Sequence, residues 1–457
     1  MMTREFGQFI AGRPADWDAA AIHAAERAFA DTIGCMIGGR ADLAAQRARR
    51  TFEQWVDPHT GVQCINGGLL PAPWAALVNG AAAHALDYDD VSEPALTHPS
   101  AALVPALLAL ALSRGQSGAR VIDAYIIGFE IQAALGAAMN DAHYGRGWHT
   151  TLTFGAVAVA GACARLLGLD AHAASAAVAA ATSFSSGSKR QFGTNMKPIH
   201  AGLAAQSGII AACMAEQGIT AADEIFEGNW SFRSLFGGES AAGFDAAREL
   251  LSGEPAITRL GIIHKAYPCC ASTHRTIDAV RALRARGLTA HNLANLTTHV
   301  SGIVVGNLMY PEPADEMQAR FSMNHCVALA LVEDRIRVRD FYPDRLARHD
   351  LRKLWPLVHM QLDPRLPGKD VIAPMPEQAR VVATLQDGTF MEEIAYFPKG
   401  HPRDPLGDDA LASKFADCSE GALAPAAALD FFRRLSGLNA AEDLQFIAAQ
   451  FAAISSD

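Results

Sequence analysis

Charged residues are scarce in this sequence, and lysine is the scarcest of them. Of the 457 residues 19% are charged and 50% are hydrophobic, so the chain can bury a large core and is not intrinsically disordered. The 38 Lys and Arg residues are outnumbered by 48 Asp and Glu residues. This acidic balance excludes a protein that binds nucleic acid through a broad basic face. Lysine occurs seven times, so a lysine inside a motif is an informative feature.

Motifs typical of several enzyme and metal-binding classes are also absent. The eight cysteines include no CxxC pair, which argues against a zinc ribbon, and they are too widely spaced for a disulfide framework. GxGxxG, GxxxxGK(S/T), GxSxG and HExxH do not occur, so nucleotide-binding, serine-hydrolase and zincin classes lack support. The N-terminus lacks a secretory pattern, and the most apolar run, residues 101–112, is too short to span a bilayer. We therefore expect a cytoplasmic protein without a membrane or nucleic-acid partner.

Helical periodicity dominates the first part of the chain, from about residue 16 to residue 251. Apolar residues recur every three or four positions up to Gly38-Gly39, which end the first helix. Many of the later helices are built from Ala, Gly and Ser and are apolar nearly all round, which is typical of buried helices that pack closely. These later helical patterns cover residues 100–114, 119–139, 155–167, 171–183 and 203–217.

The pattern changes after about residue 265. A β-branched strand is expected at 293–305, and a hairpin is expected at 379–385 and 389–396, on either side of Gln-Asp-Gly. Helical stretches are expected at 272–286, 321–333, 345–354 and again from 408 to 454. The sequence therefore predicts a mainly α fold, with a large all-helical domain (residues 1–265 plus 406–457) and an inserted, smaller α+β lid domain (residues 266–405).

Three basic side chains stand at or near the start of apolar helices. His98 lies in the run Thr97-His98-Pro99-Ser100, shortly after an acidic cluster at residues 87–90, and His149 and Lys197 precede two further helices. The free N–H groups of a helix start favour an anion, and a histidine there can exchange a proton near neutral pH. Each residue alone could be a buried polar group satisfied by a carbonyl, and the acidic cluster could be a solvated turn. Three together favour one anion-binding pocket.

A metal site is an alternative for the acidic cluster and His98. Carboxylates and an imidazole are suitable ligands, but their spacing matches no recognised metal motif.

Further candidate residues lie in or beside the predicted lid domain. Lys265 and His274 flank a turn at the expected domain boundary, where ligand pockets are common. The turn contains Cys269 and Cys270, which we interpret as packing residues because adjacent cysteines bridge poorly. His325 stands near the start of another apolar helix.

Together these motifs resemble the MmgE/PrpD family, which includes 2-methylcitrate dehydratase, cis-aconitate decarboxylase and iminodisuccinate epimerase. The resemblance covers nearly the whole chain and rests on HALDYDD…THPS, RGWHTT…G, GTNMKPIHAGLAAQSG, KAYPCCASTH and FSMNHCVALAL. It implies an all-helical domain, an α+β lid, a homodimer, and a pocket between the domains that binds a small di- or tricarboxylate without metal or another cofactor. Carried over by motif, the pocket residues are Asp87, His98, His149, Lys197 and Lys265, with His274 and His325 in addition.

The sequence departs from the family pattern at two positions. Many members have a threonine where this chain has Val91, and decarboxylase and dehydratase members often have a tyrosine where this chain has His325. A phenol and an imidazole have ordinary pKa values of about 10 and about 6.5, so they are different proton donors. These two departures bear on which reaction the protein catalyses, and they leave the resemblance to the family intact.

We hypothesise a metal-independent lyase of the 2-methylcitrate dehydratase type, which removes water from a hydroxy acid. Fixed cations would stabilise the charge that grows when a proton is taken next to a carboxylate. Lys197 and Lys265 would bind carboxylates, and Asp87 would orient a histidine. His98 and His149 would be base and acid in either order. The remaining roles are a second proton donor or substrate discriminator at His325 and substrate contacts at His274, Thr97 and Ser100.

Three other functions stay open at this point. An epimerase could use two histidines on opposite faces of a dicarboxylate such as iminodisuccinate, and His325 would suit it. A decarboxylase of the cis-aconitate type would release carbon dioxide instead of water. A non-catalytic carboxylate-binding protein could keep the fold alone, although the retained histidines and lysines argue against it.

Overall fold

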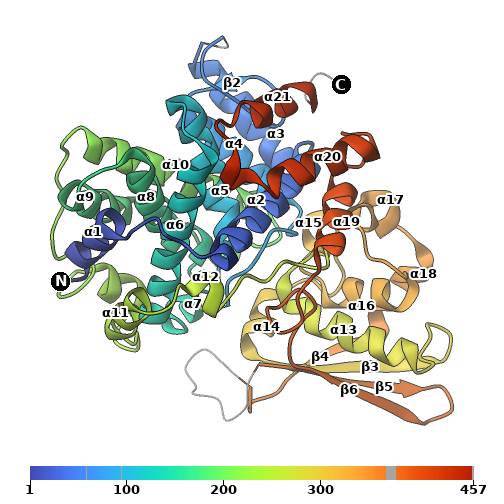
Figure 1. Ribbon diagram of the computed structural model, residues 1–457. Helices are drawn as coiled ribbons and strands as arrows, with labels where there is room; N and C mark the ends of the chain where they lie inside the picture. The colour runs from blue at the N-terminus through green and yellow to red at the C-terminus, as the bar shows by residue number, and fades with distance from the viewer. Residues whose placement is uncertain (58, 94, 367–376, 455–457) are drawn as a thin grey trace.

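Two hydrophobic cores divide the computed structural model, which describes residues 1–57, 59–93, 95–366 and 377–454. The larger core uses side chains from residues 2–262 and 411–454, and the smaller core uses residues 267–383 with Phe192. Figure 1 shows the helices of the larger core above and to the left of a sheet that carries its own helices. The predicted mainly α fold with a smaller α+β part is confirmed.

The larger part is formed by both ends of the chain. In Figure 1 the C-terminal helices, drawn in red, lie beside the N-terminal helices, drawn in blue. Its elements are α1 (Met2–Gly12), α2 (Ala19–Gly39), α3 (Leu43–Phe52), β1 (Val62–Gln63), β2 (Leu69–Leu70), α4 (Ala72–Ala85), α5 (Pro99–Arg114), α6 (Gly118–Met139), α7 (Ala142–Gly145), α8 (Thr150–Leu167), α9 (Ala171–Ala181), α10 (Met196–Glu216), α11 (Asp245–Ser252), α12 (Ala256–Arg259), α19 (Asp408–Cys418), α20 (Pro425–Leu435) and α21 (Gln445–Ile454).

Small residues let the central helices of this part approach closely. A Cβ atom at Gly202 of α10 would lie 2.2 Å from the backbone oxygen of Leu77 in α4. A Cβ atom at Gly80 of α4 would lie 2.8 Å from the Cα atom of Gly202. The two helices therefore cross with backbone against backbone, and this contact fixes the position of α10, which carries Lys197.

A four-stranded sheet forms one layer of the smaller part, in the order β4-β3-β5-β6. β3 and β4 are parallel, whereas β3–β5 and β5–β6 are antiparallel. The predicted hairpin is confirmed, since β5 and β6 pair across the Gln-Asp-Gly turn. The elements of this part are α13 (Ala271–Ala285), β3 (Leu293–Val300), α14 (Gly302–Asn307), α15 (Glu316–Ala319), α16 (Met323–Val332), α17 (Pro343–Leu346), α18 (His349–Arg352), β4 (Val358–Leu362), β5 (Ala379–Leu385) and β6 (Phe390–Ala395).

Two predicted elements of the smaller part are wrong in detail. The strand expected at 293–305 ends at Val300, because the Ser301 hydroxyl accepts the N–H of Val304 and starts α14. β-branched residues are frequent in strands, and here they continue into a helix. The helix expected at 345–354 is instead two short helices, α17 and α18, separated at residues 347–348.

In the part of the chain that the structure describes, three helices are long and apolar enough, by length and composition, to cross a membrane: α6, α8 and α10. Their most apolar windows are 94%, 89% and 72% buried inside the protein. Neighbouring helices of the larger core therefore cover most of the apolar surface of these three helices.

Candidate active site

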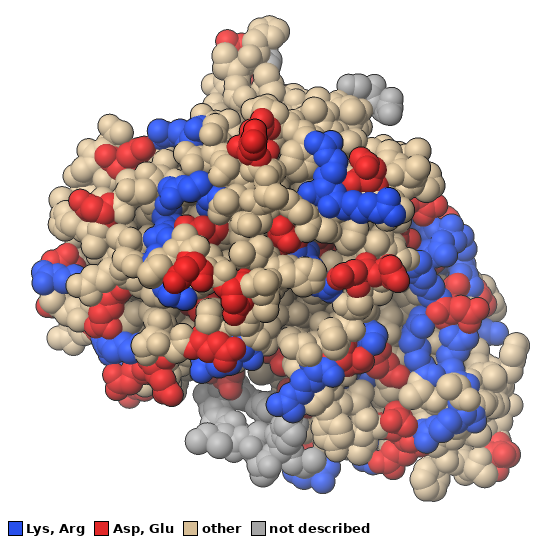
Figure 2. Space-filling model, viewed as in Figure 1, with Lys and Arg blue, Asp and Glu red and all other residues tan. Residues whose placement is uncertain are grey.

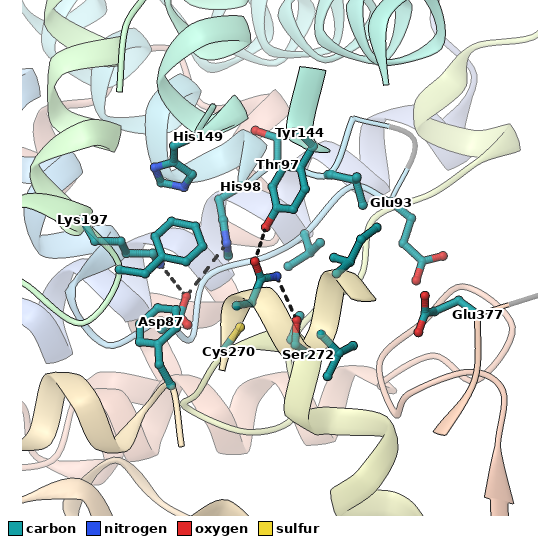
Figure 3. A pocket seen from close by; sticks show the side chains of 18 of the residues that line it. Asp87, Glu93, Thr97, His98, Tyr144, His149, Lys197, Cys270, Ser272 and Glu377 are labelled. Carbon is teal, nitrogen blue, oxygen red and sulfur yellow. Dashed lines mark hydrogen bonds and ion pairs between the residues drawn. The ribbon is translucent and has the colours of Figure 1, made fainter. Parts of the chain in front are cut away.

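A cavity of about 300 Å³ lies between the two parts of the molecule. One wall comes from the larger part and includes Asp87, His98, His149 and Lys197; the other comes from the smaller part, mainly the starts of α13 and α14. Figure 3 shows these two walls facing each other across the pocket. A ligand held there would contact both parts at once.

Besides α14, helices α5, α8, α10 and α13 begin at this pocket. His98 and His149 are the residues immediately before α5 and α8, and Lys197 is the second residue of α10. Cys270 immediately precedes α13. Each helix start adds a partial positive charge of about half a unit, so their convergence favours an anion.

Two buried lysines contact Asp87 at the inner end of the pocket. Asp87 Oδ1 accepts hydrogen bonds from Lys197 Nζ at 2.7 Å and from Lys265 Nζ at 2.9 Å. All three side chains are buried. Burial alone would raise the pKa of Asp87, but the two ammonium groups overcome it and hold that pKa well below its usual range. Asp87 is therefore a carboxylate at neutral pH, and it neutralises one of the two positive charges.

The backbone that carries Asp87 is held by three buried cations from distant segments. Asp87 has a left-handed conformation (φ 51°), which is costly for a residue other than glycine. Arg320 Nε donates to the carbonyl oxygen of Leu86, Lys265 Nζ to that of Asp87, and Lys414 Nζ to that of Tyr88. Three successive carbonyl groups thus each receive a charged donor, which accounts for the unusual conformation.

A second carboxylate orients two histidines. Asp89 Oδ2 lies 2.7 Å from His84 Nδ1 and 3.1 Å from His98 Nδ1. A carboxylate at these distances favours a proton on each Nδ1, which leaves Nε2 of His98 as a proton acceptor. That Nε2 atom lies 3.9 Å from Asp87 Oδ1. Burial lowers the pKa of His98, although Asp89 opposes this shift, and burial lowers the pKa of His84 to about 3.

His149 forms the upper side of the inner pocket in Figure 3. Its Nδ1 atom lies 2.9 Å from Nδ1 of His200, and its ring contacts the edge of Phe192. Burial holds the pKa of His149 well below its ordinary value, and His200 shifts it in the same direction. A neutral imidazole therefore stands at this side of the pocket.

The outer end of the pocket is polar and joins the two parts. Tyr144 Oη donates to Asn307 Oδ1 at 3.2 Å, and Asn307 Nδ2 donates to Ser272 Oγ at 3.1 Å, as the dashed lines in Figure 3 show. Arg275 pairs with Glu93 at 2.6 Å. These contacts link α7 and the loop around Glu93 in the larger part to α13 and α14.

The structure brings together most of the site residues that the sequence predicts. Asp87, Thr97, His98, His149 and Lys197 line the pocket. Lys265 lies directly behind Asp87.

Three other predicted residues are not among the described residues that line the pocket. Ser100 is buried, and its hydroxyl bonds Asp90 and Tyr125 inside the helical core. His274 packs against Tyr267 and has Nε2 at 3.2 Å from the carbonyl oxygen of Cys269. His325 lies between aromatic rings of the smaller core. The centroid of its ring is 5.5 Å from that of Phe341 and 5.9 Å from that of Trp355.

Several residues in and around the pocket were not predicted. His84, Asp89 and His200 do not line it but contact His98 or His149, and they lie inside the motifs quoted above, as Glu93 and Ser272 do. The three-residue spacing of Lys197 and His200 on one helix was a usable signal. The remaining residues line the pocket from segments with no shared sequence pattern; they are Asp141, Tyr144, Phe192, Arg275, Asn307 and Glu377.

One group of side chains in the described residues could hold a metal ion. One ligand atom each of His84, Asp87, Asp89 and His98 lies within 4.8 Å of the others. However, two ammonium groups already contact Asp87, and a divalent cation placed beside them would be repelled. The arrangement suits fixed cations and imidazoles better than a metal centre.

Fold and pocket together define a two-part, mainly helical protein with a buried site for a small anion. The family follows from comparison with known proteins. Residues 4–245 match the MmgE/PrpD N-terminal domain, and residues 267–433 match the MmgE/PrpD C-terminal domain. The chain therefore belongs to the MmgE/PrpD family, which confirms the predicted resemblance.

The chain is similar to proteins named as cis-aconitate decarboxylases and to one named as similar to them. Cis-aconitate decarboxylase of Homo sapiens is 30% identical over 358 residues, which cover 76% of this chain and 72% of that protein. Cis-aconitate decarboxylase of Aspergillus terreus is 26% identical over 408 residues, which cover 84% of this chain and 82% of that protein. A cis-aconitate decarboxylase-like protein of Aspergillus oryzae is 26% identical over 427 residues, or 88% of this chain and 87% of that protein.

Proposed function

We propose that this protein is a lyase that acts on a small tricarboxylate and that its reaction is decarboxylation of the cis-aconitate type. The observation that carries the proposal is the convergence of Lys197, Lys265, His98 and His149 at one buried pocket between the two parts. Similarity to cis-aconitate decarboxylases over most of the chain favours decarboxylation over the dehydration that the sequence suggested first.

Substrate binding follows from the charges of the pocket. Lys197 and the starts of α5, α8, α10 and α13 supply positive potential where carboxylate groups would lie. Lys265 holds Asp87 from behind, so that Lys197 is kept in place at the pocket surface. Low dielectric in the buried pocket strengthens each of these interactions.

In decarboxylation of the cis-aconitate type, the substrate loses one carboxylate group and gains one proton. The carbon–carbon bond to the leaving carboxylate breaks, and carbon dioxide departs. The electron pair forms a new double bond, while the old double bond takes up a proton at its far carbon. Fixed cations and helix starts stabilise the charge that spreads over the remaining carboxylates. His149 is the pocket imidazole that could deliver the proton, because Nε2 of His98 is left as an acceptor.

The test is incubation with cis-aconitate, citrate, 2-methylcitrate and iminodisuccinate, followed by proton NMR and by measurement of released carbon dioxide. Decarboxylation of cis-aconitate, with one deuteron in the product made in heavy water, is the expected result. Lys197→Ala should lower kcat/KM at least about 100-fold because a charge that stabilises the transition state is lost. Lys353→Ala, at an exposed lysine, is the matched control. Absence of carbon dioxide with every compound would overturn the proposal.

A dehydratase is the second candidate, and one observation favours it. Asp89 favours a proton on Nδ1 of His98, so Nε2 of His98 is a base, and water elimination requires a base whereas decarboxylation does not. A vinyl proton signal from citrate, or collapse of the methyl doublet of 2-methylcitrate to a singlet, without carbon dioxide, would identify this reaction.

We also propose that the protein is a homodimer, as its family resemblance implies. Light scattering should then give twice the 48.5 kDa mass of the chain. The mass of a single chain would contradict this proposal.

A further inference from the structure

The imidazole of a second histidine, His200, contacts the Nδ1 side of the His149 ring rather than its Nε2 side. The Nδ1 atoms of His149 and His200 are 2.9 Å apart, and the two residues are 2% and 4% exposed. His200 lies on α10, three residues after Lys197, so one face of this helix places Lys197 against Asp87 and His200 against His149. The same helix therefore positions both the His149–His200 pair and the contact between Lys197 and Asp87.

Both rings of this pair are neutral at physiological pH. Burial lowers the pKa of His200 to about 4, and it lowers the pKa of His149 well below its ordinary value. The groups that face His149 from other elements are His84, His98 and Lys197, and Lys197 also faces His200. None of these named groups is an anion that would favour an imidazolium.

A neutral pair joined through two Nδ1 atoms holds one proton between them. If His200 donates it, His149 must carry its own proton on Nε2; if His149 donates it, Nε2 of His149 is a bare acceptor. The tautomer of His200 thus decides whether His149 presents a donor or an acceptor to the pocket.

We propose that His200 is a positioning residue that keeps His149 in the Nε2–H form and passes it a proton during turnover. As the N–H bond at His149 Nε2 breaks and the proton joins the substrate carbon, the Nδ1 proton of His200 moves to Nδ1 of His149. His149 stays neutral, and His200, which Lys197 faces, carries the negative charge until water protonates its Nε2 and leaves hydroxide in the solvent. Before the next turnover Nε2 of His149 takes a proton from water, the Nδ1 proton of His149 returns to Nδ1 of His200, and His200 releases its Nε2 proton to water, which restores both starting tautomers. This role rests on the proposed function.

The first test does not depend on activity. In protein labelled with ¹⁵N at histidine, long-range proton–nitrogen NMR should show His149 as the Nε2–H tautomer and His200 as the Nδ1–H tautomer. In His200→Phe, which keeps a ring but removes both nitrogens, His149 should lose this fixed tautomer. A His149 spectrum that is the same in both proteins, or Nδ1–H on His149 in the wild type, would overturn the proposal.

The second test uses kinetics with cis-aconitate. His200→Phe should lower kcat about 100-fold, the scale of general acid catalysis, while KM stays within about twofold because His200 does not line the pocket in the described residues. A plot of kcat against the deuterium fraction of the solvent should be curved in the wild type, where two protons move, and straight in the variant. The exposed His172→Phe is the control.

The outcomes separate the two proposals. A wild-type protein that turns over none of the compounds overturns the proposed function, and the NMR test still decides the tautomer. An active wild type whose His200→Phe variant keeps its kcat and its curved plot overturns the relay alone. If His200→Phe does not fold, His200→Gln replaces it, since an amide can hydrogen bond to His149 but cannot relay a proton; its plot should be straight as well.

Discussion

At the scale of single residues, the Asp87 carboxylate neutralises buried ammonium groups. It is therefore required for the stability of the fold as well as for the reaction. Lys197 and Lys265 both contact its Oδ1 atom, and all three side chains are buried. A buried charge without a partner is far more costly than a buried pair. Loss of the carboxylate would leave two positive charges close together in a low-dielectric environment.

Asp87→Asn should therefore destabilise the folded protein as well as abolish turnover. The free energy of unfolding should fall by about 3–5 kcal/mol, the usual effect of breaking a buried ion pair. Urea unfolding measures this change. Asp350→Asn is the control, because Asp350 is 47% exposed in its pair with Arg348, and exposed pairs contribute at most about 1 kcal/mol. Equal losses in the two variants would contradict the role assigned to Asp87.

Residues at the start of a long apolar helix could be predicted from the sequence, and residues of the short helices α7 and α14 could not. His98, His149 and Lys197 stand out because a charged or titratable side chain interrupts an apolar pattern. Tyr144 and Asn307 meet in the pocket although 163 positions separate them. No local pattern marks such a contact, since it depends on how the two parts pack.

At the scale of elements, the helix starts that form the pocket depend on close helix crossings. α8 and α10 begin at Thr150 and Met196, earlier than the sequence predicted. The first turn of α8 contains three threonines, and that of α10 contains Lys197 and Pro198, so the apolar periodicity begins only later in each helix. Local signals were sufficient for the β5–β6 hairpin but not for the first residues of these two helices.

Gly202→Ala should displace α10 and with it both Lys197 and His200. The added Cβ atom would lie 2.2 Å from the carbonyl oxygen of Leu77, which is part of the α4 backbone and cannot move alone. Overpacking of this kind costs about 1–3 kcal/mol, and misplaced groups lower the rate of turnover. Thermal unfolding and kcat/KM measure the two effects.

Gly306→Ala is the matched control for this substitution. Gly306 lies inside α14, and a Cβ atom there would meet no atom within 4 Å. Alanine in a helix interior is favoured over glycine by up to about 1 kcal/mol, so stability should rise or stay unchanged. A Gly202→Ala protein with the stability and kcat/KM of the Gly306→Ala protein would contradict the proposed crossing.

At the scale of the whole molecule, both signs of charge are spread over the surface, while Lys197 and Lys265 place two buried ammonium groups at the inner end of the pocket. The net charge is −10, and on the face shown in Figure 2 acidic and basic side chains are interspersed among neutral ones. Surface charges are screened over about 8 Å at physiological salt, whereas buried charges act at short range. An acidic protein can therefore bind an acidic substrate.

Buried neutral histidines couple the stability of the whole fold to pH. The pKa values of His84 and His143 are lowered to about 3, and those of His200 and His325 to about 4, in each case by burial. In the unfolded chain a histidine has a pKa of about 6.5. Between these values the unfolded state binds more protons, so stability present above about pH 6.5 is lost as the pH falls toward 4.

The melting temperature should therefore fall between pH 7 and pH 5, and His325→Phe should reduce that fall. Each such histidine contributes a slope of at most about 1.4 kcal/mol per pH unit, and this variant removes one of them. Differential scanning calorimetry at several pH values measures the difference. His172→Phe should leave the fall unchanged, because His172 is already exposed in the folded protein and does not change its environment on unfolding. A melting temperature that is constant from pH 7 to pH 5 would mean that these rings are protonated in the folded state, which their burial opposes.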